Sequence, residues 1–319
     1  MSEFLERLPL SRSTHDRDDA HRDDPTLLDA DGTRLLVQRR DAVLVGRSEP
    51  DAHPTLDLRA VGQFGGAEAL RDGAEPIYLG RLIADRRNPD GRVDPAGTRV
   101  FAVAISDFDA GELEPDGDRW ITLREHGADF DDVDTGLAAQ ALGMRNFTAA
   151  HRFSPATGAR AVTEHNGWVV RGEDGGAPTF PRTDAAIIVG VVDADDRILL
   201  GANVNWTPKR YSVLAGFVEP GESLEQAVIR EVREESGARV VNPRYLGSQP
   251  WPFPASLMVG FLAELDPEQD PAEVAGDGVE LVEVRWFTRD EIVNHVDQLP
   301  GRISIARAII EEWYGGPID

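Results

Sequence analysis

The sequence predicts an α+β protein with two domains. Short apolar runs separated by turn clusters fill residues 33–122, and strand-like and helix-like patterns alternate over residues 184–319. Residues 154–183, between these regions, are rich in Gly, Pro, Thr and Arg, which is a linker composition. Since 319 residues exceed the usual size of one domain, we expect a mixed α/β N-terminal domain followed by an α+β or α/β sandwich.

The expected boundaries follow from these shifts in composition. Residues 1–30 are expected to be a loosely ordered arm, since residues 11–31 are rich in Asp, Arg and His and poor in apolar residues. Residues 31–150 form the N-terminal domain, with four apolar runs as strands and a helix over 131–153. Residues 151–183 form the linker, and residues 184–319 form the second domain.

The second domain has its elements in the order strands, helix, strands, helix. Residues 185–204 are expected to form a hairpin that turns at Asp193–Asp196. Strands at 212–218 and 245–251 flank a helix over 223–237, and two further strands cover 257–265 and 279–288. The chain then ends in a helix over 304–315.

Composition excludes several functional classes. The formal net charge of −24 argues against a protein that binds nucleic acid through a generally basic surface. No apolar run approaches the roughly 20 residues that span a membrane, and the N-terminus does not resemble a secretory signal. The expected location is cytoplasmic. The chain has no cysteine, which excludes disulfides and thiolate metal sites.

The helix over 223–237 carries the clearest chemical signal. An apolar stripe runs along it, and Glu231, Glu234 and Glu235 are spaced at i, i+3 and i+4, which places three carboxylates on one surface. Because like charges this close repel each other, a hard divalent cation such as Mg²⁺ or Mn²⁺ is a natural partner. The alternative interpretation is an ordinary solvated acidic face.

The spacing is not isolated, because the region resembles the signature of the Nudix hydrolases. That signature reads Gly, five residues, Glu, seven residues, then Arg-Glu-apolar-any-Glu-Glu-any-Gly-apolar. Its fixed positions are Gly216, Glu222, Arg230, Glu231, Val232, Glu234, Glu235, Gly237 and Ala238. The resemblance implies an α/β/α sandwich that holds metal ions against a diphosphate.

The resemblance also implies a role for each position. Glu231 and Glu235 are expected to bind the metal, with Glu234 close to the same cluster, and one glutamate orients or deprotonates the attacking water. Glu222 and Arg230 are expected to form an ion pair that braces the loop against the helix. The two remaining fixed glycines, Gly216 and Gly237, are expected to serve turn geometry.

Residues 248–256, SQPWPFPAS, follow the box and suggest the substrate. They resemble the signature of the NADH pyrophosphatase branch of the family, although a proline-stiffened surface loop is the simpler alternative. We expect a rigid loop here rather than an ordinary strand. The resemblance implies that Phe217 and Trp251 stack on flat rings of the substrate, with Trp251 acting across a homodimer interface, and that Gln249 offers its amide to a phosphate or sugar.

Three further positions match that branch. Glu280 corresponds to a late metal-binding glutamate, although a polar residue on an alternating strand is the alternative. Ala306 corresponds to a small backbone contact to the base, although alanine on a helix more commonly packs in a core. Phe180 lies before the first strand of the domain, beside the expected substrate pocket, and packing is an equal alternative.

The linker departs from the branch, whose bacterial members carry a zinc ribbon with two CxxC pairs. Ser154 and Thr157 occupy the first pair of positions, and Gly172 and Gly175 occupy the second. None of these residues supplies a thiolate, so no structural zinc is expected. Hydrogen bonds and apolar contacts must hold the linker instead.

These features predict a metal-dependent hydrolase that splits NADH or NAD⁺ into nicotinamide mononucleotide and AMP. The same chemistry can remove an NAD cap from RNA, although no basic track is evident for a long RNA. The alternatives are a Nudix hydrolase of ADP-ribose or another nucleoside diphosphate derivative, and a non-catalytic dinucleotide sensor.

Overall fold

The computed structural model describes residues 3–46, 53–206 and 209–318. The chain divides into two compact units. The N-terminal unit contains Arg12–Arg182 and Pro252–Ala255, and the C-terminal unit contains Met1–Ser11, Thr183–Trp251 and Ser256–Asp319. Both units combine strands and helices, as the sequence predicts.

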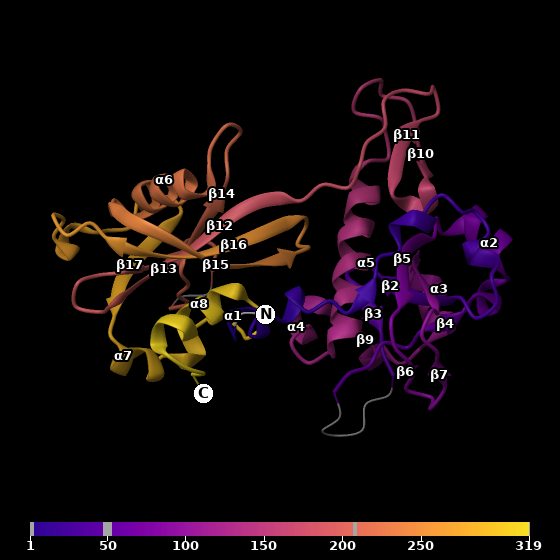
Figure 1. Ribbon diagram of the computed structural model, residues 1–319, viewed down its shortest axis with the longest axis horizontal. Helices are drawn as coiled ribbons and strands as arrows, with labels where there is room; N and C mark the ends of the chain where they lie inside the picture. Colours follow the sequence, from indigo (N-terminus) through magenta and orange to yellow (C-terminus); the bar gives the residue numbers. More distant parts are fainter. Residues whose placement is uncertain (1–2, 47–52, 207–208, 319) are drawn as a thin grey trace. The chain divides into compact units, whose positions relative to one another are not determined.

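The N-terminal unit is built on a sheet in the order β1-β5-β8-β2-β3-β9, with β4 paired to β2 (Figure 1). Its strands are β1 His15–Asp16, β2 Arg34–Arg39, β3 Ala42–Leu44, β4 Arg59–Ala60, β5 Ile77–Leu82, β8 Arg99–Ile105 and β9 Trp120–Thr122. Two smaller sheets pair β6 Arg86–Arg87 with β7 Val93–Asp94, and β10 Ala161–Glu164 with β11 Val169–Gly172. Its helices are α2 Ala67–Gly73, α3 Asp107–Leu113, α4 Leu123–His126 and α5 Asp132–Ala150.

Strand alternation separates the two faces of this sheet. Leu35 and Val37 of β2 pack with Phe101 and Val103 of β8 in the main core of the unit. Successive side chains of a strand point to opposite faces. Helix α5 contacts β5, β2 and β1. It begins where the sequence predicts, because Asp131 caps its N-terminus by accepting from the Asp134 N–H.

Local hydrogen bonds order the linker at the positions where the resemblance would place cysteines. Ser154 Oγ accepts from the Ala156 N–H at 3.3 Å, and Thr157 Oγ1 accepts from the Ala159 N–H at the same distance. A Cβ added to Gly172 would lie 2.5 Å from Asp174 Oδ1 and 3.1 Å from Ser154 Cβ. Oxygen acceptors and the Asp174 carboxylate therefore occupy the space between the two turns.

The C-terminal unit contains a six-stranded sheet in the order β15-β16-β12-β13-β17, with β14 paired to β12. Its strands are β12 Asp184–Val192, β13 Ile198–Asn203, β14 Leu214–Phe217, β15 Val240–Trp251, β16 Ser256–Leu265 and β17 Leu281–Phe287. Its helices are α1 Glu3–Glu6, α6 Leu224–Ser236, α7 Arg289–Val293 and α8 Ile305–Tyr314. Strands β12 and β16 run parallel, and the other pairs in this sheet are antiparallel.

Helices cover both faces of this sheet (Figure 1). Ile187 and Val189 of β12 pack under α6 in one core. Ile188, between them, packs under α8 in the other core with Ile305 and Ile309. Alternate residues of one strand thus serve two cores, and the layers form the α/β/α sandwich that the sequence predicts.

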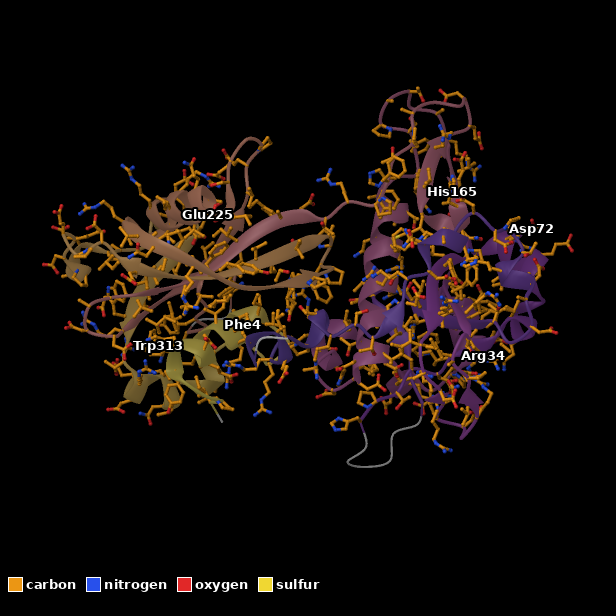
Figure 2. The ribbon with its side chains drawn as sticks, in the orientation of Figure 1. Phe4, Arg34, Asp72, His165, Glu225 and Trp313 are labelled. Atoms are coloured by element: carbon orange, nitrogen blue, oxygen red, sulfur yellow. The ribbon has the colours of Figure 1, made fainter. Side chains whose placement is uncertain are left out.

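The expectation of a loosely ordered arm over residues 1–30 is wrong. Phe4 and Leu8 are buried in the core beneath α8, and Arg7 forms an ion pair with Glu312 at 2.5 Å (Figure 2). In the N-terminal unit, Leu27 and Leu28 are buried in the main core. Composition does not predict this ordered packing, because a few buried apolar side chains are enough to anchor a segment that is otherwise charged.

Two predictions overlap at residues 248–251, a strand over 245–251 and a rigid loop over SQPWPFPAS, and the structure has the strand there. Gln249, Pro250 and Trp251 end β15 and pair with residues Met258, Leu257 and Ser256 of β16. β15 is the last strand of its sheet, and proline is tolerated on an edge strand because no ladder hydrogen bond is lost on the open side. Only Pro252–Ala255 form the turn of this hairpin.

Candidate functional site

Helix α6 is held in place by its caps and its apolar stripe. The Ser223 hydroxyl accepts from the Gln226 N–H at the start, and Gly237 ends the helix with a φ of 67°, in the left-handed region that favours glycine. Ala227, Val228 and Val232 are buried against the sheet. The glutamates therefore project from the remaining faces of a fixed helix.

Gly216 is required for space rather than for a turn. It lies in β14, opposite Ile187 of β12. A Cβ added to Gly216 would lie 1.9 Å from Cδ of Glu231, which is closer than two such atoms can approach. The Glu231 carboxylate is therefore packed directly against the backbone of β14, and the turn role expected for Gly216 is replaced by close approach.

Arg230 connects the acidic residues of the box. Its guanidinium donates two hydrogen bonds of 2.8 Å to Glu222 and one of 2.9 Å to the Phe217 carbonyl. The other terminal nitrogen contacts Glu231 at 2.8 Å and Glu234 at 3.0 Å. The bidentate Arg230 contact, together with a hydrogen bond from the Glu219 N–H, lowers the pKa of Glu222 to about 2. This arrangement matches the brace that the sequence predicts.

Glu235 is the most perturbed carboxylate at the site. It is buried, and its Oε2 has no hydrogen-bond partner among the described residues. Burial is the largest cause that raises the pKa of Glu235 to about 8, followed by the charges of Glu231, Glu280 and Asp277. Burial also raises the pKa of Glu231, against the opposing effect of Arg230. A buried carboxylate with one unpartnered oxygen, beside other carboxylates, fits a site for a hard cation.

The carboxylates are nevertheless not arranged as a finished metal cage. In the described part of the chain, no group of three or more His, Asp or Glu side chains is placed to hold a metal ion. The Glu234 side chain is 60% exposed and paired with Arg230. Glu280, just before β17, is exposed and acts on Glu235 through its charge. Glu231, Glu235 and Glu280 thus form one electrostatic cluster, while Glu234 belongs to the Arg230 network.

A cavity of about 200 Å³ lies next to this cluster, within the C-terminal unit. Glu235 lines it together with Trp251 from the end of β15 and Ala306 from the first turn of α8. The structure therefore brings together three of the residues that the sequence predicts. The other lining residues come from β12 to β17 and from the start of α8, and they include Asn203, Ala215, Met258, Leu281, Ser304 and Ile305.

Three predicted contact residues do not line this cavity. The Phe217 ring is on the surface, with 58% of the residue exposed. Gln249 is fully buried and donates from Nε2 to the Ile303 carbonyl at 3.0 Å, just before α8. Phe180 is exposed and belongs to the N-terminal unit. In this structure the Gln249 amide contacts the segment just before α8, the helix that carries Ala306, rather than presenting an open face toward a ligand.

Sequence reasoning missed Asp277. Its carboxylate accepts from the N–H groups of Val279, Glu280 and Leu281 and orders the loop before β17. Its own N–H donates to the Glu235 carbonyl at 3.1 Å, which ties that loop to α6. The signal available in the sequence is the pattern Asp-Gly, typical of a turn, three residues before Glu280.

Comparisons with known proteins identify both parts of the chain. Residues 181–309 match the NUDIX domain, and residues 27–146 match the NADH pyrophosphatase-like rudimentary NUDIX domain. The NAD-capped RNA hydrolase NudC of Mycobacterium bovis is 40% identical over 260 residues, which is 74% of this chain and 80% of that protein. The NudC of Mycobacterium tuberculosis gives the same values.

A more distant relative has the same name. The NAD-capped RNA hydrolase NudC of Pseudomonas aeruginosa is 38% identical over 202 residues, covering 62% of this chain and 68% of its own length.

Among the described residues, no helix is long and apolar enough to cross a membrane. Two matched domains and relatives at this identity place the protein in a family: the chain belongs to the Nudix hydrolases, in the branch of the NudC proteins.

Proposed function

We propose that this protein hydrolyses the diphosphate bond of NADH and NAD⁺, giving nicotinamide mononucleotide and AMP, and that it removes NAD caps from RNA. One observation carries the proposal: the buried carboxylate of Glu235 and the ring of Trp251 line the same cavity. A charged group for chemistry and a flat aromatic group for recognition are the two parts that a dinucleotide diphosphate requires. The names of the NudC relatives support the same substrate class.

The residues present fit a divalent metal, Mg²⁺ or Mn²⁺. Glu231 and Glu235 would hold it, with Glu280 and Glu234 completing an oxygen-rich shell. When bound, the metal would neutralise the diphosphate oxygens and lower the pKa of the attacking water. Glu231 is packed against Gly216 and pairs with Arg230 at 2.8 Å. Arg230 would keep Glu222 as its bidentate partner if Glu231 turned from it toward a cation.

Proton handling is the role proposed for the glutamates. Burial and the neighbouring carboxylates raise the pKa of Glu235 to about 8 in the absence of a cation, and a bound cation would keep this side chain ionised, which is the form that can accept a proton from water. Its Oε2 has no hydrogen-bond partner among the described residues, so one oxygen is available. Trp251 and Ala306 would then hold the base or nicotinamide ring beside the reacting phosphate, with Ser304 and Ile305 closing the same side.

A panel of substrates tests this proposal. The full chain is incubated with NADH, NAD-capped RNA, ADP-ribose and diadenosine tetraphosphate, each with Mg²⁺ or Mn²⁺, and the products are separated. We expect NADH or NAD-capped RNA to be cleaved with the highest kcat/KM. Faster cleavage of ADP-ribose would contradict the substrate, and binding without cleavage under both metals would identify a sensor instead.

A homodimer is part of the proposal, since the branch that the chain resembles uses the tryptophan of its motif across an interface. The measurement is light scattering coupled to size-exclusion chromatography on the full chain. A mass near twice the 34.9 kDa of one chain is expected. A monomeric mass with full activity would show that Trp251 acts in the site of its own subunit and not across a dimer interface.

A further inference from the structure

The N-terminal unit contains a large cavity of its own, of about 950 Å³. Its floor is the sheet face opposite the main core, where Gln38 of β2, Ala102 and Ala104 of β8, and Ile77 of β5 lie. The end of α5 and the strand β10 supply the walls. Ala102 and Ala104 carry only methyl groups, so these residues of β8 bring no polar side chain to this face, and Ala104 is exposed while Gln38 and Ala102 are buried.

Gln38 is an unusual residue for such a floor. It is fully buried, and neither Nε2 nor Oε1 has a hydrogen-bond partner among the described residues. Its neighbours on the same face are the alanines of β8, which offer no polar group, and in the parallel register Gln38 pairs with Ala104. Buried amides are nearly always satisfied, so one with both groups unpaired calls for an explanation. One explanation is a bound ligand that supplies a hydrogen-bond donor and an acceptor to this amide.

The walls of this cavity are basic in a chain that is strongly acidic overall. Arg145, Arg152 and Arg160 line it, and within the described part of the chain their guanidinium groups form no ion pair or hydrogen bond. Arg71 also lines it but is paired with Asp29 at 2.5 Å. Two acidic residues also line the cavity: Asp72 of α2, which is labelled in Figure 2, and Glu75, which follows that helix. Positive charge without a partner is therefore concentrated on the side of α5 and β10.

Apolar surface completes the site. Phe153 and Val162, which line the same cavity, are exposed large hydrophobic residues. The His151 ring lines it as well, and its Nδ1 is 2.7 Å from the Phe147 carbonyl, which leaves Nε2 for another partner. A flat ring can pack against such surface while its edge meets a polar group.

We propose that this cavity binds an adenine nucleotide. The Gln38 amide presents a donor beside an acceptor, which is the complement of the N6 and N7 edge of adenine. Its terminal torsion is broad, so the amide can turn to meet the base. The three arginines then receive the phosphate, since guanidinium groups bind phosphate in a bidentate manner. The site lies wholly in the N-terminal unit and is additional to the diphosphate site of the C-terminal unit.

The ligand can be a free nucleotide or an adenylate within an RNA strand, and the chemistry at the cavity is the same. Isothermal titration of the full chain with AMP and with a short oligoadenylate separates the two sources. Tighter binding of AMP supports the free nucleotide, and tighter binding of the oligoadenylate supports the strand. If adenosine and inorganic phosphate bind as well as AMP does, the combined recognition of base and phosphate is wrong.

Matched variants assign the binding to this cavity. Gln38→Leu removes the amide but keeps the volume, and we expect AMP binding at this site to weaken about tenfold or more. The triple variant Arg145→Gln, Arg152→Gln, Arg160→Gln is expected to weaken AMP without weakening adenosine. Arg87→Gln is the control, since Arg87 is exposed on β6 and does not line the cavity.

The C-terminal unit is also expected to bind AMP, so the stoichiometry must be resolved. Trp251→Ala should retain the site described here, and the double variant Gln38→Leu, Trp251→Ala should lose both. Gln38→Leu is also expected to raise Tm, because it removes an unsatisfied buried amide. If Gln38→Leu binds AMP with the stoichiometry and affinity of the unaltered chain, the proposal is wrong, whatever the outcome of the substrate panel.

Discussion

Glu235, the carboxylate proposed to accept a proton, is strongly perturbed by its surroundings. It is buried, one oxygen lacks a partner, and three other carboxylates raise its pKa. Such an arrangement destabilises the fold in the absence of a cation, and binding of a cation relieves it. We therefore expect that a substitution that removes this carboxylate raises the stability of the cation-free protein and lowers its activity.

Replacing Glu235 by Gln tests both effects. In the presence of a chelator, the pKa of about 8 in the folded state exceeds its ordinary 4.5, so the folded chain binds more protons between these values. The free energy of unfolding therefore falls as pH rises from about 4.5 to 8. Denaturant unfolding at pH 5 and pH 8 should show Glu235→Gln gaining stability relative to the unaltered chain at the higher pH. A pH-independent difference would contradict this.

The same variant should lose activity by about a hundredfold or more, because the group that accepts the proton is gone. Turnover of NADH with Mn²⁺ is the measurement. Glu225→Gln is the control, since Glu225 lies in the first turn of α6 and does not line the cavity. Activity retained in Glu235→Gln would remove Glu235 from its proposed role.

Gly216→Ala tests the close approach between β14 and α6. The added methyl would lie 1.9 Å from Cδ of Glu231, so the carboxylate must move. We expect a loss of about 1–3 kcal/mol in stability together with weaker metal binding. Gly301→Ala is the matched control, because a Cβ there meets nothing within 4 Å. Equal behaviour of the two variants in thermal unfolding and metal titration would show that Glu231 has room to move.

Trp251→Ala tests recognition. Loss of the ring should raise KM for NADH by about tenfold while leaving the affinity for Mn²⁺ unchanged. Phe217→Ala is the comparison, because Phe217 is exposed and does not line the cavity. A larger effect from Phe217→Ala would restore the stacking role that the sequence predicts for it and would move the substrate outside the cavity.

At the scale of elements, local hydrogen bonds order the β10–β11 hairpin and the turns beside it. At the two positions of the first turn, Ser154 and Thr157 each present a hydroxyl that accepts a backbone N–H, whereas the second turn has Gly172 and Gly175. The Asp174 carboxylate fills the space beside Gly172 and accepts from the Gly176 N–H at 3.2 Å. Local hydrogen bonds of this kind stabilise turns at modest individual strength.

The purified full chain should therefore contain no stoichiometric zinc, and a chelator should leave its Tm unchanged in metal-free buffer. Ser154→Ala should lower stability by about 1 kcal/mol, since it removes a buried acceptor. Elemental analysis and thermal unfolding are the measurements, with Thr157→Ser as a control that keeps its hydroxyl. One zinc per chain would overturn this account of the linker.

At the scale of the molecule, the two folded units do not follow the order of the chain. The first eleven residues belong to the C-terminal unit, where Leu8 is fully buried in the core beneath α8. A fragment restricted to residues 184–319 would lack these side chains. The N-terminal segment is thus structural for the unit that carries the Nudix box.

Leu8→Ala should destabilise the C-terminal unit by about 2–5 kcal/mol, as expected for a large-to-small change in a core. Glu6→Ala, on an exposed position of α1, is the control and should change little. The measurement is denaturant unfolding of the full chain, with the loss of NADH turnover followed in parallel. Equal stabilities would show that the segment is not needed by this core.

Local sequence determined much of the site. The caps of α6, its apolar stripe, the spacing of Glu231, Glu234 and Glu235, and the Glu222–Arg230 brace all lie within one short segment. Interactions over a few residues decide such features, so a periodic pattern predicts them well. The order of strands and helices in the sandwich is predicted for the same reason, because the alternation of apolar residues shows which face of each element is buried.

Tertiary structure decided which residues meet. The parallel pairing of β12 with β16 and the docking of α8 bring Trp251 and Ala306 to the cavity of Glu235, whereas Phe217 remains outside it. Packing also buried Phe4 and Leu8, and it left Gln38 unpaired on a floor of alanines. These outcomes depend on segments far apart in the chain, whose contacts are set by long-range pairing and by shape, and no local pattern encodes either of them.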